Sequence, residues 1–175
     1  VPALFDLIIG STDGGSIYYT LDGRDPRVAA SGAEIVTHVL VAEDASKCAF
    51  MPTDASLDNS WFAETFDDDA WLKGTEGAGY ETSGRYDPLI DANLDFIGQV
   101  SSTEQETIYL RTEFDVADPA LFDALILKVR YDDGFVAYLN GAEIERELAP
   151  GSVGNPVAWN AGADASHRDD DAEVF

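Results

Sequence analysis

The sequence predicts an all-β fold of antiparallel strands, and three features of the chain indicate it. Residues 107–116 alternate between apolar and polar side chains, a pattern typical of a half-buried strand. Asn140-Gly141, a strong signal for a two-residue hairpin turn, separates two further alternating runs. The only helix-compatible stretch, residues 118–125, is too short to stand alone.

Two different regions come before the first of these alternating runs. Residues 5–9 and 16–21 predict two short strands joined by a glycine-rich turn. Residues 52–106 are rich in turn-forming side chains and predict long loops. Because long loops on a β scaffold often carry binding sites, the aromatic side chains in this region are candidates for function.

Residues 108–148 predict a meander, in which each strand pairs with the next along the chain. In the first strand, one face is expected to hold Ile108, Leu110, Phe114 and Val116, and the other Tyr109, Arg111, Glu113 and Asp115. Similar alternation follows at 125–131 and 135–139.

Three local features are also predicted in the C-terminal half of the chain. Asp118 is expected to cap one helical turn that links two strands, with Pro119 at its first position. The strand after Asn140-Gly141 is expected to place Ile144, Arg146 and Leu148 on a common face. Residues 172–175 indicate a strand that is just beginning.

The composition excludes several classes of function. The chain has 34 acidic and 10 basic residues, a net charge of −24. No Lys/Arg cluster is present to neutralise phosphates, so we expect neither nucleic-acid binding nor attraction to anionic membranes. No apolar run approaches the roughly 18 residues of a membrane span, so we expect no membrane insertion. Cys48 is the only cysteine, which excludes an intrachain disulfide.

Residues 14–27, GGSIYYTLDGRDPR, resemble the signature hairpin of the small β modules at the C-terminus of chitobiases and hexosaminidases. The resemblance implies an accessory module without catalytic residues. We therefore expect residues 1–30 to be part of such a module and residues 31–40 to form a linker.

A second resemblance covers residues 41–175. The segments WFAETFDDDAWLKGTEGAGYE, IYLRTEFDV, LKVRYDDGFVAYLNGAEIERELAPG and WNAGADASH occur in that order. They resemble the galactose-binding-like jelly-roll domain of large secreted proteins from planctomycete-type bacteria, where it accompanies lamin-tail and spore-coat-kinase-like modules. Two features depart from that family: Asp69 stands where the family usually has serine, and the family's final Gly-x-Asn-x-Leu-Ala strand is missing.

The resemblance implies a jelly-roll β-sandwich that lacks its last one or two strands. It also implies a bacterial protein that is secreted or held at the cell surface, with neighbouring domains of a longer chain as partners. It suggests an association with carbohydrate, but it does not imply an activity.

Acidic residues form two candidate sites. Asp132 and Asp133 are adjacent, so in a strand they point to opposite faces and make a poor acid–base pair. A turn explains them best, with Asp accepting backbone N–H groups and Gly134 at positive φ; a contribution to calcium binding is the alternative. In the second site, Asp67, Asp68 and Asp69 are the better calcium candidates, since calcium prefers carboxylate oxygens from loops. The alternative is that they cap the turn before Trp71.

A carbohydrate site would use exposed aromatic rings to stack on sugars, with amide and guanidinium groups to bind the hydroxyls. The candidates are Trp61, Trp159, Tyr80, Arg111 and Asn160. Each has an alternative in packing. Trp71 and Tyr80 are expected to plug the end of the domain, Trp61 and Trp159 are equally suited to either role, and Arg111 is suited to a pair with Glu113.

Nucleophilic catalysis has little support, because His38 and His167 are the only histidines and no Gly-x-Ser-x-Gly motif occurs. The leading hypothesis is therefore a non-catalytic module that binds a polysaccharide or glycan, or mediates adhesion. The alternative is a structural spacer or assembly domain without a ligand, which would expose a sheet edge near Phe175.

Overall fold

The computed structural model describes residues 37–81, 84, 86–96, 106–167 and 173–174. The chain divides into two compact units, residues 1–38 and 39–175, and their boundary falls within the linker expected at 31–40. The strands expected at 5–9 and 16–21, and with them the chitobiase-type hairpin, lie outside the described residues.

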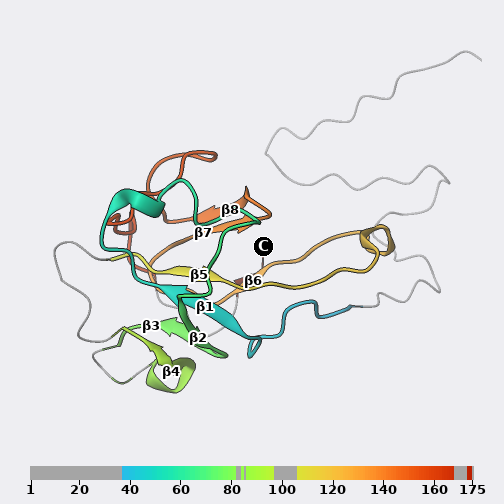
Figure 1. The fold of residues 1–175 in the computed structure, drawn as a ribbon, viewed down its shortest axis with the longest axis horizontal. Helices are drawn as coiled ribbons and strands as arrows, with labels where there is room; N and C mark the ends of the chain where they lie inside the picture. The colour runs from blue at the N-terminus through green and yellow to red at the C-terminus, as the bar shows by residue number, and fades with distance from the viewer. Residues whose placement is uncertain (1–36, 82–83, 85, 97–105, 168–172, 175) are drawn as a thin grey trace, which may run out of the picture. The chain divides into compact units, whose positions relative to one another are not determined.

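The described part of the second unit is mostly strands, as expected for an all-β fold (Figure 1). Its helices are three short 3-10 turns, so no helix reaches seven residues within the described ranges. The strands are β1 (Lys47–Phe50), β2 (Leu72–Gly74), β3 (Gly77–Gly79), β4 (Ile90–Asp95), β5 (Tyr109–Arg111), β6 (Lys128–Val129), β7 (Phe135–Leu139), β8 (Ala142–Glu147) and β9 (Glu173–Val174). The 3-10 turns are η1 (Ala55–Leu57), η2 (Asp87–Leu89) and η3 (Pro119–Leu121).

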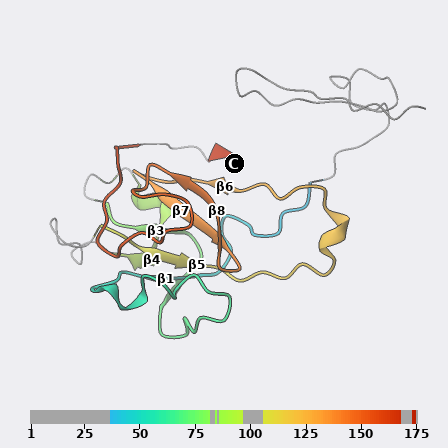
Figure 2. The same ribbon diagram turned by 90° about the horizontal axis from the view of Figure 1, so that it is seen from above.

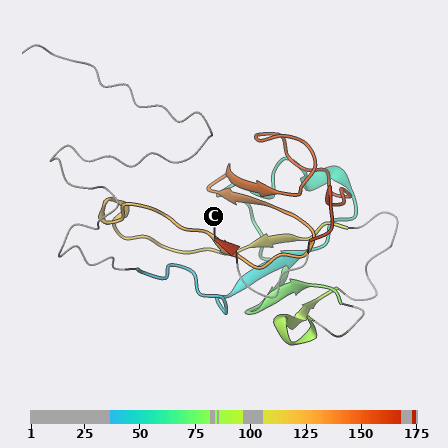
Figure 3. The same cartoon turned by 180° about the vertical axis from the view of Figure 1, so that it is seen from behind.

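A three-stranded antiparallel sheet, in the order β2-β1-β5, lies at the centre of this unit. Figures 1 and 3 show the β7–β8 hairpin to one side of it and β4 to the other. A small apolar core packs beside β1, formed by Ala49, Met51, Leu94 and Phe96, with Ala78 and Ile108 against it.

The expected meander is wrong except for its last hairpin. β5 pairs with β1 and not with β6, while β6 pairs with β9 at the far end of the chain. Among the strands β5 to β8, which the expected meander covers, only β7 and β8 pair with each other. Alternation identifies a half-buried strand, but it carries no information about which strand lies beside it.

The face of β5 is also the reverse of the expected one. Tyr109 is 2% exposed, whereas Leu110 is 45% exposed. Tyr109 places a large ring in the interior, and its hydroxyl donates to the Asp58 carboxylate at 3.1 Å, so burial leaves no polar atom unsatisfied. Tyr109, whose hydroxyl has a hydrogen-bond partner, therefore occupies the inner face on which Leu110 was expected.

The β7–β8 turn forms as predicted. Asn140 and Gly141 both have positive φ, 49° and 84°, the left-handed conformations that a type I′ turn requires. Further along the hairpin a β-bulge interrupts the register, since Tyr138 pairs with Glu143 but Ala137 pairs with Glu145. Ile144 is therefore the extra residue.

This bulge overturns the expected common face of Ile144, Arg146 and Leu148. With one residue inserted, Arg146 shares a face with Glu143, three positions earlier. Ile144 is left 45% exposed.

Two shorter predictions are confirmed. Asp118 caps η3, its side chain accepting the N–H of Ala120 at 3.0 Å. The strand expected at the end of the chain is present as β9. Between β5 and β6 the chain forms a long excursion with η3 at its tip, which we call the β5–β6 arm (residues 112–127; Figure 2).

Candidate functional site

Seven aromatic rings form a connected group that we call the aromatic cluster. Its members are Phe50, Trp61, Phe62, Phe66, Trp71, Tyr109 and Tyr138. Trp61 stacks on Tyr109, with ring centroids 4.5 Å apart and planes at 8°. Phe62 stacks on Tyr138 at 4.4 Å and 11°. The cluster therefore joins the loop that follows η1 to both β5 and β7.

The expected role of Trp71 in packing agrees with its position, and that of Tyr80 does not. Trp71 is 8% exposed and stacks on Phe50, with centroids 5.4 Å apart. Tyr80 is 43% exposed. Desolvation raises the pKa of its phenol, with a further contribution from the negative charge of Glu106.

Arg111 ties β5 to the same loop. Its Nε donates to Asp68 Oδ2 at 2.8 Å, and its Nη1 donates to the carbonyls of Trp61 at 2.6 Å and Ala63 at 3.1 Å. The side chains of Arg111 and Asp68 are 11% and 16% exposed. The expected pair with Glu113 is wrong, because Arg111 lies on the inner face of β5 and reaches a carboxylate 43 residues away.

The three calcium candidates lie in one turn. Asp68 pairs with Arg111, Asp67 Oδ1 accepts the N–H of Asp69 at 3.1 Å, and Asp68 O accepts the N–H of Trp71 at 2.9 Å. Asp69 lies 3.6 Å from the ammonium of Lys73. Within the described ranges, no three His, Cys, Asp or Glu side chains are grouped to hold a metal. These contacts fit the turn interpretation, and calcium binding stays a prediction.

Asp58 connects the aromatic cluster to Trp159. Its Oδ1 accepts the hydroxyl of Tyr109 at 3.1 Å and the N–H of Trp159 at 3.2 Å. Burial, together with this hydrogen bond, raises the pKa of Tyr109 well above its ordinary value. Trp159 is half-buried and the adjacent Asn160 is exposed.

The structure therefore brings together three of the five predicted sugar-binding residues. Trp61, Arg111 and the backbone of Trp159 converge on Tyr109 and the loop around it. Asn160 follows Trp159 at the surface. Tyr80 is not among them. Besides desolvation, the charges that raise the pKa of Tyr80 are those of Glu106, Asp133 and Asp132, which are not part of this group.

Asp132 and Asp133 lie just before β7, Asp132 in a β-bridge and Asp133 at a bend, so the expected turn is present only as a bend. Positive φ (71°) occurs at Asp133 and not at Gly134. Asp133 Oδ1 accepts the N–H of His167 at 3.1 Å, and the Asp133 N–H donates to His167 O at 3.2 Å. Gly134 is required for a steric reason, because a Cβ at this position would clash with Leu148 O at 2.8 Å.

The sequence reasoning missed a buried ion pair on β8. Arg146 Nε and Nη2 donate to the two carboxylate oxygens of Glu143 at 2.8 and 3.0 Å, and the side chains are 8% and 4% exposed. Arg146 also donates to the carbonyls of Pro150 and Asn155. These bonds hold the loop after β8, and the bond from Arg146 lowers the pKa of Glu143. The only sign of this ion pair in the sequence is the Glu-x-x-Arg spacing. In a regular strand, residues three apart lie on opposite faces, so the spacing indicates a pair only when the bulge at Ile144 is known.

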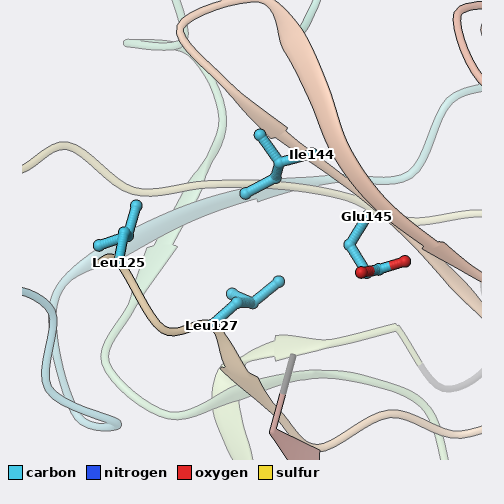
Figure 4. A pocket seen from close by; sticks show the side chains of 4 residues that line it. All are labelled: Leu125, Leu127, Ile144 and Glu145. Atoms are coloured by element: carbon cyan, nitrogen blue, oxygen red, sulfur yellow. The ribbon is translucent and has the colours of Figure 1, made fainter. Parts of the chain in front are cut away.

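Two hollows open on the surface near β8. One, of about 230 Å³, is lined by Leu125, Leu127, Ile144 and Glu145 (Figure 4). The other, of about 380 Å³, lies over the Glu143–Arg146 pair and the loop around Val153. Neither is lined by a residue predicted to bind a sugar or a metal.

Comparison with known proteins gives no identification, since no protein-family model, curated protein or solved structure matches the chain. No helix among the described residues has the length and apolar composition needed to cross a membrane.

Proposed function

We propose that this chain is a non-catalytic structural module of a multidomain, secreted or surface-held bacterial protein. One observation carries the proposal: groups suited to ligand binding are used for internal contacts. The guanidinium of Arg111 binds Asp68 and two carbonyls, and the ring of Trp61 stacks on Tyr109. Side chains engaged in this way hold loops in place, which is what a spacer or assembly domain requires.

The fold that we propose for residues 41–175 is a galactose-binding-like jelly-roll sandwich. Two observations support it. The described strands pair mainly in antiparallel fashion. The aromatic cluster also packs between the β5 sheet and the β7–β8 hairpin, as side chains between two sheets do.

Affinity electrophoresis through gels that contain neutral or acidic polysaccharides, with and without calcium, tests the proposed function. We expect the full chain to migrate equally in all gels. A second measurement tests the internal role of Arg111: in urea unfolding, we expect the Arg111→Met variant to be less stable than the unsubstituted chain. Specific retardation by a polysaccharide, with Arg111→Met as stable as the unsubstituted chain, would overturn the proposal.

A second candidate function is glycan binding, and the position of Trp159 favours it. Its backbone is held by Asp58, its side chain is half-buried, and the amide of Asn160 is exposed next to it. A held tryptophan beside a free amide suits a sugar ring. If this candidate holds, Trp159→Ala abolishes retardation in one of the gels, while Tyr80→Ala, at a surface outside the cluster, leaves it unchanged.

A further inference from the structure

Asn140 and Gly141 form the turn between β7 and β8, and Asn-Gly is also a chemically reactive pair. The backbone nitrogen of a glycine can attack the side-chain carbonyl carbon of a preceding asparagine, since no Cβ stands beside the attacking atom. Asn140 is exposed, and among the described residues its amide has no hydrogen-bond partner. The other four asparagines of the chain precede serine, leucine, proline or alanine. Asn140 is therefore the asparagine of this chain best suited to the reaction.

The reaction converts the side-chain amide into a carboxylate in two steps. The Gly141 nitrogen forms a bond to Asn140 Cγ, and the amide nitrogen leaves with the displaced proton as ammonia, so that a succinimide ring remains. Water then adds to one of the two ring carbonyls and breaks its bond to the ring nitrogen, which regains a proton. Opening at one carbonyl gives aspartate, and opening at the other gives isoaspartate, in which Cβ is part of the main chain.

The closed turn holds the reacting atoms apart. Asn140 has φ 49° and Gly141 has φ 84°, as in a type I′ turn. The first central residue of such a turn has ψ of about +30°, the mirror image of a type I turn. This conformation places the next nitrogen and Cβ on opposite sides of the Cα–C bond, whereas ring closure needs them on the same side. The turn must therefore open before the reaction can occur.

Contacts beside the turn resist this opening. Leu139 pairs with Ala142 at the end of the hairpin. A Cβ at Gly141 would lie 3.9 Å from Phe62 O, so the turn lies against the loop that follows η1. The ring of Tyr138 stacks on Phe62, with centroids 4.4 Å apart. Opening the hairpin costs these contacts, and the free energy of local opening sets the population of the reactive form.

We propose that Asn140 is a site of spontaneous deamidation that the closed β7–β8 hairpin suppresses and that reacts from the opened hairpin. The two products differ in their effect on the fold. Aspartate keeps the turn, since Asp-Gly suits a type I′ turn as Asn-Gly does. Isoaspartate lengthens the main chain inside a two-residue turn, so the hairpin can no longer close against the aromatic cluster.

The test measures the rate of conversion at Asn140 in the full chain, incubated in mildly alkaline buffer. Liquid chromatography with mass spectrometry separates the aspartate and isoaspartate peptides after digestion. The reference is a free peptide of residues 138–143, which is too short to hold a stable hairpin. We expect both products in the peptide and a rate at least tenfold lower in the folded chain. Asn155 is an internal control with neither product, because Pro156 has no N–H with which to form the ring.

The variant Tyr138→Ala tests whether hairpin opening controls the rate. It removes the ring that stacks on Phe62, so we expect the rate at Asn140 to rise at least fivefold in a chain that still unfolds cooperatively in urea. Tyr80→Ala is the matched control: it removes an exposed tyrosine ring outside the aromatic cluster, and we expect no change. Phe62→Leu removes the same stacking with a smaller loss of volume, and it replaces Tyr138→Ala if that variant does not fold.

A rate in the folded chain less than tenfold below that of the peptide would overturn the proposal, as would absence of both products from the peptide. An unchanged rate in a folded Tyr138→Ala or Phe62→Leu variant would also overturn it, because opening of the hairpin would then not control the reaction.

Discussion

Removing the guanidinium of Arg111 tests how strongly the loop around Trp61 is held to β5. Arg111→Met keeps much of the aliphatic stem but leaves Asp68 without its ion-pair partner and two carbonyls without a donor. Breaking a buried ion pair by removing one partner costs about 3–5 kcal/mol. Because the two side chains keep 11% and 16% exposure, we expect the lower end, about 3 kcal/mol.

Equilibrium unfolding in urea, followed by tryptophan fluorescence, measures this change. A loss of about 3 kcal/mol lowers the folding equilibrium constant on the order of 100-fold and moves the midpoint to lower urea. Arg111→Met with Asp68→Asn should cost less than the sum of the two single changes, because no uncompensated charge remains. Lys73→Met is the control: its pair with Asp69 is solvent-exposed, so we expect a loss below about 1 kcal/mol. A similar small loss for Arg111→Met, or strict additivity in the double variant, would refute the reasoning.

Three further substitutions test other parts of the structure. The bond from Arg146 lowers the folded-state pKa of Glu143, so its contribution to stability is complete above the ordinary pKa of about 4.5 and is lost as pH falls through the lowered value. Glu143→Gln should therefore flatten the loss of stability as the pH falls below about 4.5, measured by urea unfolding. Gly134→Ala should cost about 1–3 kcal/mol from its clash with backbone carbonyls, whereas Gly79→Ala, whose Cβ meets only an ordinary contact at 3.6 Å, should stay within about 0.5 kcal/mol. Tyr109→Phe should cost about 1–2 kcal/mol through the lost hydrogen bond to Asp58, measured by the urea midpoint.

Each of these three predictions has an outcome that would contradict it. An unchanged acid profile in Glu143→Gln would mean that the ion pair does not respond to pH. Equal stability of the two glycine variants would remove the steric argument at Gly134. A neutral Tyr109→Phe would mean that Asp58 holds its loop without the tyrosine hydroxyl.

Features set by neighbouring residues could be predicted from the sequence. The Asn140-Gly141 turn and the Asp118 cap depend on local backbone conformation and on one side chain reaching an N–H two residues away. The strand pairs β1–β5 and β6–β9 could not be predicted, since they join segments far apart in the chain. The bulge at Ile144 was missed because inserting one residue leaves the amino-acid pattern looking like ordinary alternation.

The candidate site shows why residue type alone does not decide a role. A tryptophan face that suits a sugar suits a tyrosine ring equally well, and Trp61 stacks on Tyr109. An arginine that could bind hydroxyls also satisfies carbonyls and a carboxylate, as Arg111 does. The sequence marked both side chains as candidates for a sugar site, but only the distances show that Arg111 holds the backbone of Trp61.

The central claim, that the loop aromatics serve packing and not ligand binding, can be tested at the three indole N–H groups. Each tryptophan gives one indole signal in a ¹H–¹⁵N NMR spectrum, assigned by single replacement with phenylalanine. During titration with soluble neutral and acidic glycans, with and without calcium, we expect the signals of Trp61, Trp71 and Trp159 to remain in place. A saturable shift of Trp61 or Trp159 with one glycan would contradict the claim and identify the ligand class.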